Sequence, residues 1–483
     1  MTIRSRLVAT VAALAVAACA RNPATGQRQI SLIGEGQEVQ MGQEYAQQVD
    51  AQMGLYDDAD LQRYVAQIGS RMAATSERPN LPWSFKVIDD PAVNAFALPG
   101  GPIYITRGIL ATMENEAQLA MVLGHEIGHV TARHSVTQMS SQQLAQLGLA
   151  VGSIVSPAIA RYGQIASAGL GILFLKYSRD DERQSDELGL RYMRRTGYDL
   201  READEVFTVL DRSSQAEGGR VPAWLSTHPD PGDRARSIER AVAAVPADSI
   251  GRTVNADAFM RHLDGMIFGA NPREGFFRGG LFLHPDMRFK LSFPEGWQYQ
   301  NLKQGVVAVS PQQDAVVQLA LARENSAEAA ARAFFSQQGV QAGQGARGSI
   351  NGLPAVAGAF RAQTKNGIIQ GSAAFIEHGG SVFGLLSYAP EARWGAYQSA
   401  ADRTIRSFET LTDQAVLNVQ PLRIDLVRID RPTTIEALAR TRQAVVPVAT
   451  LALINQVEPQ TPLEAGTTVK WVVGTPVALS GGN

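Results

Sequence analysis

Residues 123–135 read LGHEIGHVTARHS, and this stretch decides how the rest of the chain is interpreted. On an α-helix, residues four positions apart lie about 40° apart around the axis, so His125 and His129 project from one face. That spacing allows two imidazole nitrogens to bind one zinc ion. Glu126 lies about 100° around the helix, where it can act as a general base that takes a proton from water. The pattern therefore predicts one Zn²⁺ per chain and hydrolytic chemistry.

The residues around this motif favour a long and largely buried helix. The stretch 114–135 begins with acidic residues, contains few helix breakers and has apolar residues on much of its circumference. Unpaired histidines in such a helix would be costly, which argues against a solvated helix face. Gly124 and Gly128 each cost up to about 1 kcal/mol of helix propensity relative to Ala. We expect these small residues to let a neighbouring element approach closely.

A catalytic zinc site needs a third protein ligand. His134 lies five residues past His129, roughly 140° around a continuous helix, so we interpret it as a surface or capping histidine. Glu182 and Asp186 are again four residues apart, on a helix predicted for 178–196. One of them can bind the metal while the other orients a histidine. On charge pattern alone, however, a solvated helix face is the simpler interpretation of the acidic pair.

Four motifs, in a fixed order, carry a family resemblance: NAFALPGG (94–101), HEIGHVTARHS (125–135), SRDDERQSDELG (178–189) and STHPDPGDR (226–234). They resemble the zinc metallopeptidases of the HtpX and CAAX-prenyl-protease family, which are gluzincins. The resemblance spans about residues 22–245, roughly half of the chain. Its opening, NPATGQRQISLIGEGQEVQMGQ (22–43), resembles the periplasmic BepA/LoiP-like branch of that family.

The resemblance implies a role for each matching residue in the two helical motifs. His125 and His129 correspond to zinc ligands, and Glu126 corresponds to the general base. Glu182 corresponds to the third ligand, and Asp186 to an aspartate that orients a ligand without binding the metal. The family usually has Glu-Ala before this aspartate, where the present chain has Gln184-Ser185. Because neither position is a ligand, the zinc expectation is unchanged.

The other two motifs imply residues on the substrate side of the site. His228 corresponds to a histidine near the metal that either helps to hold the oxyanion or, in a latched state, occupies the open position. Arg234 corresponds to the arginine that accompanies it. The NAFALPGG stretch resembles an active-site edge strand, to which an extended peptide adds through main-chain hydrogen bonds. We therefore expect Asn94 and Ala95 to contact substrate. Alternatively, the NAFALPGG stretch is an ordinary hairpin in the core, and His228 is a loop histidine held between turns.

The N-terminus indicates export to the cell envelope. Residues 1–18 combine two arginines with a short apolar stretch, which is typical of a signal peptide. They end at Cys19, the only cysteine of the chain, in a sequence that resembles a bacterial lipobox. A lipidated Cys19 followed by Ala20 implies a lipid anchor in the outer membrane of a Gram-negative bacterium, facing the periplasm. Residues 19–36 then form a tether.

Length and composition indicate several globular domains. A chain of 483 residues is too long to fold around a single hydrophobic core. Its net charge of −2, without a Lys/Arg block, gives no reason to expect a nucleic-acid partner. We predict a multidomain α+β chain. Its parts are a mainly helical metallopeptidase domain with a small active-site sheet (37–265), an α/β domain that resembles PsbP (280–412), and a strand-helix-helix-strand module that resembles LysM (421–474). Two apolar stretches within 147–175 predict a helical hairpin that packs on the peptidase domain or dips toward lipid.

Together these features predict a zinc endopeptidase that acts on unfolded or misassembled envelope proteins. Two alternatives remain open at this point. One is a latched, largely non-proteolytic assembly factor or chaperone for the outer membrane. The other is a scaffold that binds peptidoglycan through residues 421–474.

Overall fold

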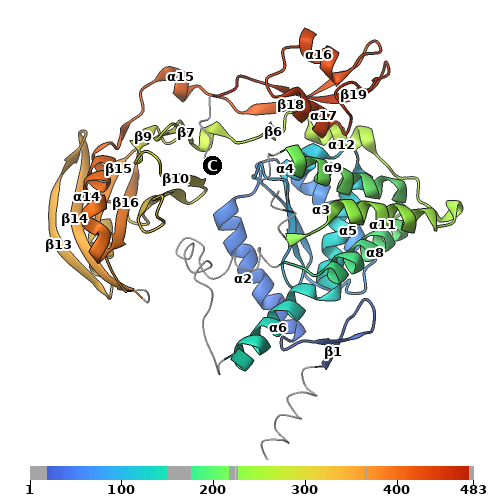
Figure 1. Ribbon diagram of the computed structural model, residues 1–483, viewed down its shortest axis with the longest axis horizontal. Helices are drawn as coiled ribbons and strands as arrows, with labels where there is room; N and C mark the ends of the chain where they lie inside the picture. Colours follow the sequence, from blue (N-terminus) through green and yellow to red (C-terminus); the bar gives the residue numbers. More distant parts are fainter. Residues whose placement is uncertain (1–18, 150–175, 217–223, 225–226, 365–366, 478–483) are drawn as a thin grey trace, which may run out of the picture. The chain divides into compact units, whose positions relative to one another are not determined.

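The computed structural model describes residues 19–149, 176–216, 224, 227–364 and 367–477 (Figure 1). The chain divides into two compact units. Unit 1 combines the chain up to Gly269 with Arg423–Val473, and unit 2 holds Ala270–Leu422 with the residues from Gly474 onward. The predicted signal peptide and most of the predicted hairpin at 147–175 lie outside the described residues. Among the helices that are described, none is long and apolar enough to cross a bilayer.

Unit 1 is mainly helical. The α-helices described in its first segment, up to Gly269, are α2 (Glu35–Met53), α3 (Ala59–Ala73), α4 (Arg107–Thr112), α5 (Glu116–Ala132), α6 (His134–Leu149), α8 (Arg179–Arg195), α9 (Ala203–Ala216), α11 (Pro231–Ala243) and α12 (Ala256–Leu263). A hairpin of β1 (Cys19–Arg21) and β2 (Arg28–Ile30) precedes them.

A small sheet lies beside these helices and has the strand order β3-β5-β4. Strand β3 (Ser84–Ile88) is parallel to β5 (Pro102–Thr106), and β4 (Ala95–Ala97) is antiparallel to β5. Strands β4 and β5 thus form a hairpin, with β4 at one end of the sheet and α4 following β5 directly. Its turn requires glycine because Gly100 has a φ of +75° and a Cβ there would lie 2.7 Å from the Cα of Val39.

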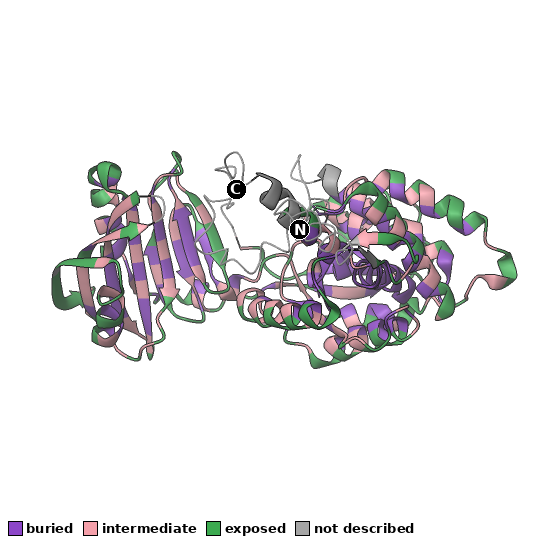
Figure 2. Ribbon diagram, turned by 90° about the horizontal axis from the view of Figure 1, so that it is seen from below, coloured by how far each residue is buried: buried purple, intermediate pink, exposed green. Residues whose placement is uncertain are grey.

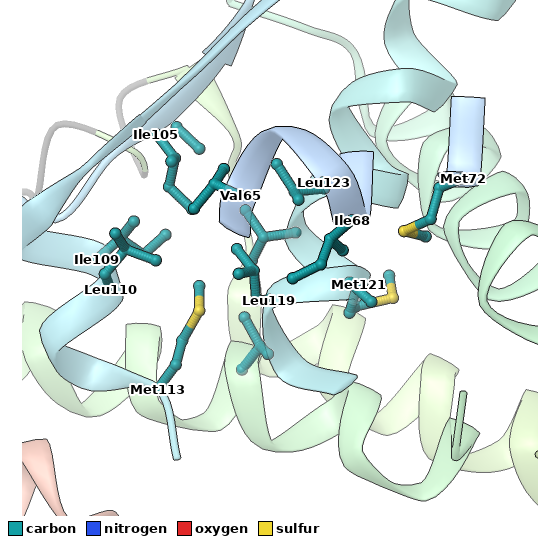
Figure 3. Close-up of a cluster of buried hydrophobic side chains, with 14 of the residues drawn as sticks. Val65, Ile68, Met72, Ile105, Ile109, Leu110, Met113, Leu119, Met121 and Leu123 are labelled. Carbon is teal, nitrogen blue, oxygen red and sulfur yellow. The ribbon is translucent and has the colours of Figure 1, made fainter. Parts of the chain in front are cut away.

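Helix α5 forms the centre of unit 1, and every one of its residues is buried. Its apolar side chains pack against α3 and the segment after β5, as Figure 3 shows for Leu119, Met121 and Leu123 beside Val65 and Ile68. The structure confirms the buried helix that the apolar pattern predicts. A helix in this position presents its polar residues to other protein groups and not to water.

A polar network holds the start of α5. The carboxylate of Glu116, the first residue of the helix, accepts hydrogen bonds from Tyr64 Oη (2.9 Å), Asn255 Nδ2 (3.0 Å) and Tyr198 Oη, and it pairs with Arg71 (2.9 Å). A negative charge here also favours the N-terminal end of the helix dipole. The network therefore fixes the start of α5, the helix that carries His125 and His129.

Helices α5 and α8 pack closely because small residues face each other. A Cβ added at Gly124 would lie 3.0 Å from the Cα of Gly189, and one at Gly128 would lie 3.1 Å from the Cα of Ser185. Helix α8 itself begins at a capping box in which Ser178 and Asp181 bond each other's backbone and side chain. The expectation that the glycines beside the histidines admit a neighbour is confirmed.

Residues after Leu422 add to unit 1. They form β18 (Leu422–Arg428), α16 (Ile435–Thr441), α17 (Val448–Ile454) and β19 (Thr468–Val473), which is the predicted order of strand, helix, helix and strand. Their sheet has the order β19-β18-β6, where β6 (Ile267–Phe268) precedes the boundary between the units. The fully buried ammonium of Lys470 donates to the carbonyls of Ala111 and Met113 at the end of α4. The resemblance to LysM stays a prediction.

Unit 2 is a mixed α/β unit. Its sheets have the orders β10-β11-β12-β16-β15-β14-β13 and β17-β9-β8-β7. The elements are β7 (Phe276–Arg278), β8 (Leu281–His284), β9 (Phe289–Ser292), β10 (Gln298–Leu302), β11 (Gly305–Val309), β12 (Val316–Leu321), α13 (Ala327–Phe335), β13 (Val340–Ile350), β14 (Leu353–Thr364), β15 (Gly367–His378), β16 (Ser381–Pro390), α14 (Glu391–Arg406), β17 (Glu409–Thr410) and α15 (Gln414–Leu417). Buried and less buried residues alternate along most of β16, and Figure 2 shows the buried residues of this unit on its strands.

Candidate metal centre

Three parts of unit 1 bring four potential metal ligands together. Helix α5 supplies His125 and His129, and helix α8 supplies Glu182. The fourth potential ligand, His228, lies four residues after Trp224, and its backbone N–H donates to the carbonyl of Trp224 at 2.8 Å. One ligand atom from each of the four ligands lies within 4.8 Å of the others, and all four side chains are buried. The structure thus brings together the residues that the sequence places far apart.

The geometry of the first three ligands fits zinc. The Nε2 atoms of His125 and His129 lie 2.9 Å apart. The carboxylate oxygens of Glu182 lie 3.6 Å from the first of these nitrogens and 3.5 Å from the second. Two imidazole nitrogens and a carboxylate converging on one point are a ligand set that zinc peptidases use.

Asp186 holds the ring of His125 from the opposite side. Its Oδ1 lies 2.9 Å from Nδ1 of His125, so the ring proton on Nδ1 is donated to the carboxylate and Nε2 keeps its lone pair. Burial lowers the pKa of His125 to about 3, which favours the neutral ring. His125 is therefore in the protonation state that a metal ligand requires.

Arg234 neutralises two acidic residues of α8, Glu182 and Asp186. Its Nη1 lies 2.6 Å from Glu182, and its Nη2 and Nε bond the two oxygens of Asp186 at 2.6 and 2.8 Å. Burial by itself raises the pKa of Glu182, but His228 and Arg234 bring this pKa well below its ordinary value. Glu182 is thus ionised, as a metal ligand must be. The solvated-face interpretation of this acidic pair is wrong, because α8 turns both carboxylates toward α5.

Glu126 lies beside the cluster without joining it. Its carboxylate accepts a hydrogen bond from the backbone of Ala97 in β4, and burial raises its pKa to about 7. Its Oε1 is buried, has no hydrogen-bond partner among the described residues, and lies 3.7 Å from Nε2 of His228. An unsatisfied carboxylate oxygen with this pKa is suited to take a proton near neutral pH.

His228 packs on the aromatic ring of Trp224. The two rings are stacked with centroids 4.7 Å apart, and Nδ1 of His228 lies 3.0 Å from Glu182 Oε1 and 3.3 Å from His125 Nε2. His228 therefore lies in direct contact with two of the other potential ligands, Glu182 and His125.

His134 is not the surface or capping histidine that helical spacing predicts. Helix α5 ends at Ala132, because Arg133 adopts a left-handed conformation with φ of +63°. The chain turns there, and the buried ring of His134 comes to lie with its Nδ1 2.9 Å from Nδ1 of His129. His134 is not one of the four potential ligands, but it contacts His129, which is one of them.

The two residues expected on the substrate side lie at the sheet end next to the cluster. Ala95 is buried in β4, and Asn94 immediately precedes it. The side-chain Oδ1 of Asn94 is buried and has no hydrogen-bond partner within the described residues. The backbone of Trp224 donates to the carbonyl of Val93 at 3.3 Å, so Trp224 lies beside the residue that precedes Asn94.

Residues 59–242 match Peptidase family M48, and the match includes the whole cluster. This part of the chain is an M48 peptidase domain. The chain is 30% identical over 223 residues to the Beta-barrel assembly-enhancing protease of Escherichia coli (strain K12), which covers 44% of this chain and 45% of the relative. It is 37% identical over 182 residues to the Mitochondrial metalloendopeptidase OMA1 of Schizosaccharomyces pombe, covering 36% and 51%. The chain thus spans about half the length of these relatives.

Among solved structures, the chain is similar to cyanobacterial PsbP from Synechocystis sp. PCC 6803. The sequence identity is 16%, and the similarity covers 28% of this chain and 94% of that protein. The TM-score of 0.24 is too low for an inference about structure or function.

The M48 domain also contains aromatic residues near the metal ligands that sequence reasoning missed. Tyr177 stacks on His129 with ring centroids 4.0 Å apart, and its hydroxyl bonds Ser135 at 2.8 Å. The guanidinium of Arg234 lies over the rings of Phe207 and Trp224, at 4.5 and 4.9 Å from their centroids. In the sequence, the feature that could have indicated these aromatic contacts is Trp224, four residues before His228.

Proposed function

We propose that this chain is a zinc-dependent endopeptidase of the bacterial cell envelope that hydrolyses peptide bonds in misfolded or stalled envelope proteins. The observation that carries the proposal is the unsatisfied carboxylate oxygen Oε1 of Glu126 beside the His125–His129–Glu182 cluster. The M48 domain and the protease relatives support it.

Each residue of the centre has a defined part in this reaction. His125, His129 and Glu182 hold the zinc, which when bound polarises a carbonyl and lowers the pKa of water. Glu126 takes a proton from the attacking water and passes it to the leaving amide nitrogen. An extended substrate pairs with the edge at β4, where Asn94 and Ala95 lie.

Cleavage of an unfolded protein such as casein tests this proposal. We expect the purified zinc-loaded chain to cleave casein, a chelator to stop the cleavage, and Glu126→Gln to abolish it while the zinc content stays the same. Glu187→Gln is the matched control, because Glu187 is an exposed carboxylate on α8. Cleavage that persists in Glu126→Gln would remove Glu126 from the reaction.

The position of His228 favours a second candidate, a latched form with little proteolysis. Its ring lies against Glu182 and the cluster, and the backbone of Trp224 beside it bonds Val93, two residues before the strand where substrate would pair. If His228 closes the site, His228→Ala raises casein cleavage several-fold. If His228 assists the reaction, the same variant lowers it.

The proposal also includes two attachments of the chain to the cell envelope, one to a membrane and one to peptidoglycan. We assign the lipid anchor to Cys19, in the periplasmic face of the outer membrane, and peptidoglycan binding to residues 421–474. The loss of membrane association in Cys19→Ala tests the anchor. Retention of the purified chain on isolated sacculi tests peptidoglycan binding, and its absence would remove that assignment.

A further inference from the structure

A continuous chain of hydrogen bonds runs from the N-terminal hairpin to the metal ligand His129. Asn22, buried in the turn after β1, donates from Nδ2 to Oε1 of Gln184 at 2.9 Å. The same oxygen lies 2.9 Å from Nε2 of His134. Nδ1 of His134 in turn lies 2.9 Å from Nδ1 of His129. The four side chains, which come from three separate segments of the chain, thus form one continuous series of hydrogen bonds.

The backbone fixes the direction of the first bond. The side-chain Oδ1 of Asn22 accepts hydrogen bonds from the backbone N–H groups of Ala24 (2.9 Å) and Thr25 (3.3 Å). A backbone N–H can only donate, so the oxygen of the amide must face the turn. The NH₂ group of Asn22 must then face Gln184, which has to present its oxygen in return.

The same reasoning fixes the proton on His134. The Gln184 oxygen is an acceptor, so Nε2 of His134 carries the proton that bonds it. A second oxygen near this nitrogen agrees, since Oδ1 of the Asp181 carboxylate lies 3.5 Å away. With its proton on Nε2, the neutral ring of His134 presents a lone pair at Nδ1.

The last bond determines which nitrogen of His129 can bind a metal. A lone pair on Nδ1 of His134 requires the proton to be on Nδ1 of His129. The Nε2 of His129 then has its lone pair directed into the cluster. If every bond in the series were reversed, Nε2 of His129 would carry a proton and could not be a ligand.

We propose that His134, Gln184 and Asn22 are positioning residues that set the tautomer of His129, so that the N-terminal hairpin is a working part of the metal centre. The inference rests on the proposed zinc site and adds residues 19–30 to it. Asn22 thereby links the turn three residues after Cys19 to the protonation state of a ligand on α5.

Asn22→Asp tests the proposal because it reverses the polarity at one end of the series. The aspartate keeps the oxygen that caps the backbone of Ala24 and Thr25, but it replaces the donor facing Gln184 with an acceptor. Gln184 then turns its NH₂ group toward both neighbours, which favours the wrong tautomer of His134 and of His129. We expect zinc affinity, measured in the purified full chain by competition with a chromophoric chelator, to fall by about 10–100-fold.

A nonspecific effect of the added charge would have the opposite sign, since a negative charge attracts a cation. Thermal unfolding of the zinc-free protein shows whether Asn22→Asp merely damages the fold. Arg28→Gln, an exposed change in β2 of the same hairpin, is the matched control and is expected to leave zinc affinity unchanged.

Substitutions at Gln184 separate positioning from packing. Gln184→Met removes the acceptor at similar size and is expected to weaken zinc binding, whereas Gln184→Glu keeps an acceptor oxygen and is expected to restore it. In the Gln184→Met background the series is already cut, so Asn22→Asp should have no further effect.

The outcomes distinguish this inference from the proposed function. A wild-type chain that binds no zinc overturns both. A wild-type chain that binds zinc and cleaves casein, together with Asn22→Asp and Gln184→Met variants of wild-type zinc affinity, overturns the positioning role alone. Additive losses in the double variant also contradict it.

Discussion

The Nε2 atoms of His125 and His129 lie 2.9 Å apart, while the Nδ1 atom of each ring is engaged on the far side by Asp186 and His134. Two imidazole lone pairs directed at each other repel, and a cation between them removes the repulsion. The protein around the two rings is thus organised for a metal, and we expect its stability to depend on that metal.

Removal of zinc should therefore destabilise unit 1. A ligand that binds only the folded state, at a free concentration 100 times its dissociation constant, adds about 2.7 kcal/mol of stability. We expect a chelator to lower the thermal unfolding midpoint of the wild-type chain. Glu182→Gln, which weakens the ligand set, should start lower and respond much less to the chelator. Equal responses of the two proteins would contradict the assignment of Glu182 as a ligand.

Loss of Arg234 should be strongly destabilising even without metal. Its guanidinium is buried between the carboxylates of Glu182 and Asp186, and removing one partner of a buried ion pair typically costs about 3–5 kcal/mol. We expect a loss of this size for Arg234→Met in chemical denaturation of the zinc-free protein. Adding Asp186→Asn should recover part of it, because one uncompensated charge is then gone. Two independent, additive losses would show that the charges are not coupled.

The placement of the candidate ligands His125, His129 and Glu182 could be predicted from sequence because it depends on spacing within two helices. His125 and His129 share a face through helical spacing, and the pair on α8 follows the same rule. Gly124 and Gly128 predict that a neighbouring element approaches α5 closely, and the structure identifies this element as α8.

The role of His134 could not be predicted because it depends on distant contacts. Arg133 holds its left-handed conformation with hydrogen bonds to Glu38 Oε2 (2.9 Å) and to the carbonyl of Ile33 (2.7 Å), about a hundred positions earlier. Only this turn directs His134 back toward His129. The burial of Lys470 could not be predicted from sequence either, because it also depends on distant contacts. Its neighbours in the strand, Val469 and Trp471, are buried. Strand alternation would place its side chain in solvent, yet α4 covers it.

The pH dependence of stability should reveal the network at the start of α5. Burial raises the pKa of Glu116, but hydrogen bonds from Tyr198, Tyr64 and Asn255 outweigh it and bring the pKa below the ordinary value of 4.5. A carboxylate with a lowered folded-state pKa contributes stability that is present above the unfolded pKa and is lost as pH falls through the folded one. We expect Glu116→Gln to be less stable than wild type at pH 7. The difference in free energy of unfolding should shrink as pH falls below about 4.5, and a difference that stays constant would contradict this.

Gly128→Ala should disturb the metal centre although it improves helix propensity. The new methyl group would lie 3.1 Å from the Cα and the carbonyl oxygen of Ser185, so α8 has to move away from α5 by a few tenths of an ångström. Overpacking of this kind costs about 1–3 kcal/mol, which exceeds the gain of up to about 1 kcal/mol from replacing glycine. Because Glu182 moves with α8, zinc affinity should fall together with stability. Gly36→Ala in α2 is the matched control, since a Cβ there meets nothing within 4 Å, and it should leave zinc affinity unchanged. A Gly128→Ala protein that is more stable than wild type and binds zinc equally well would show that α8 does not need this close approach.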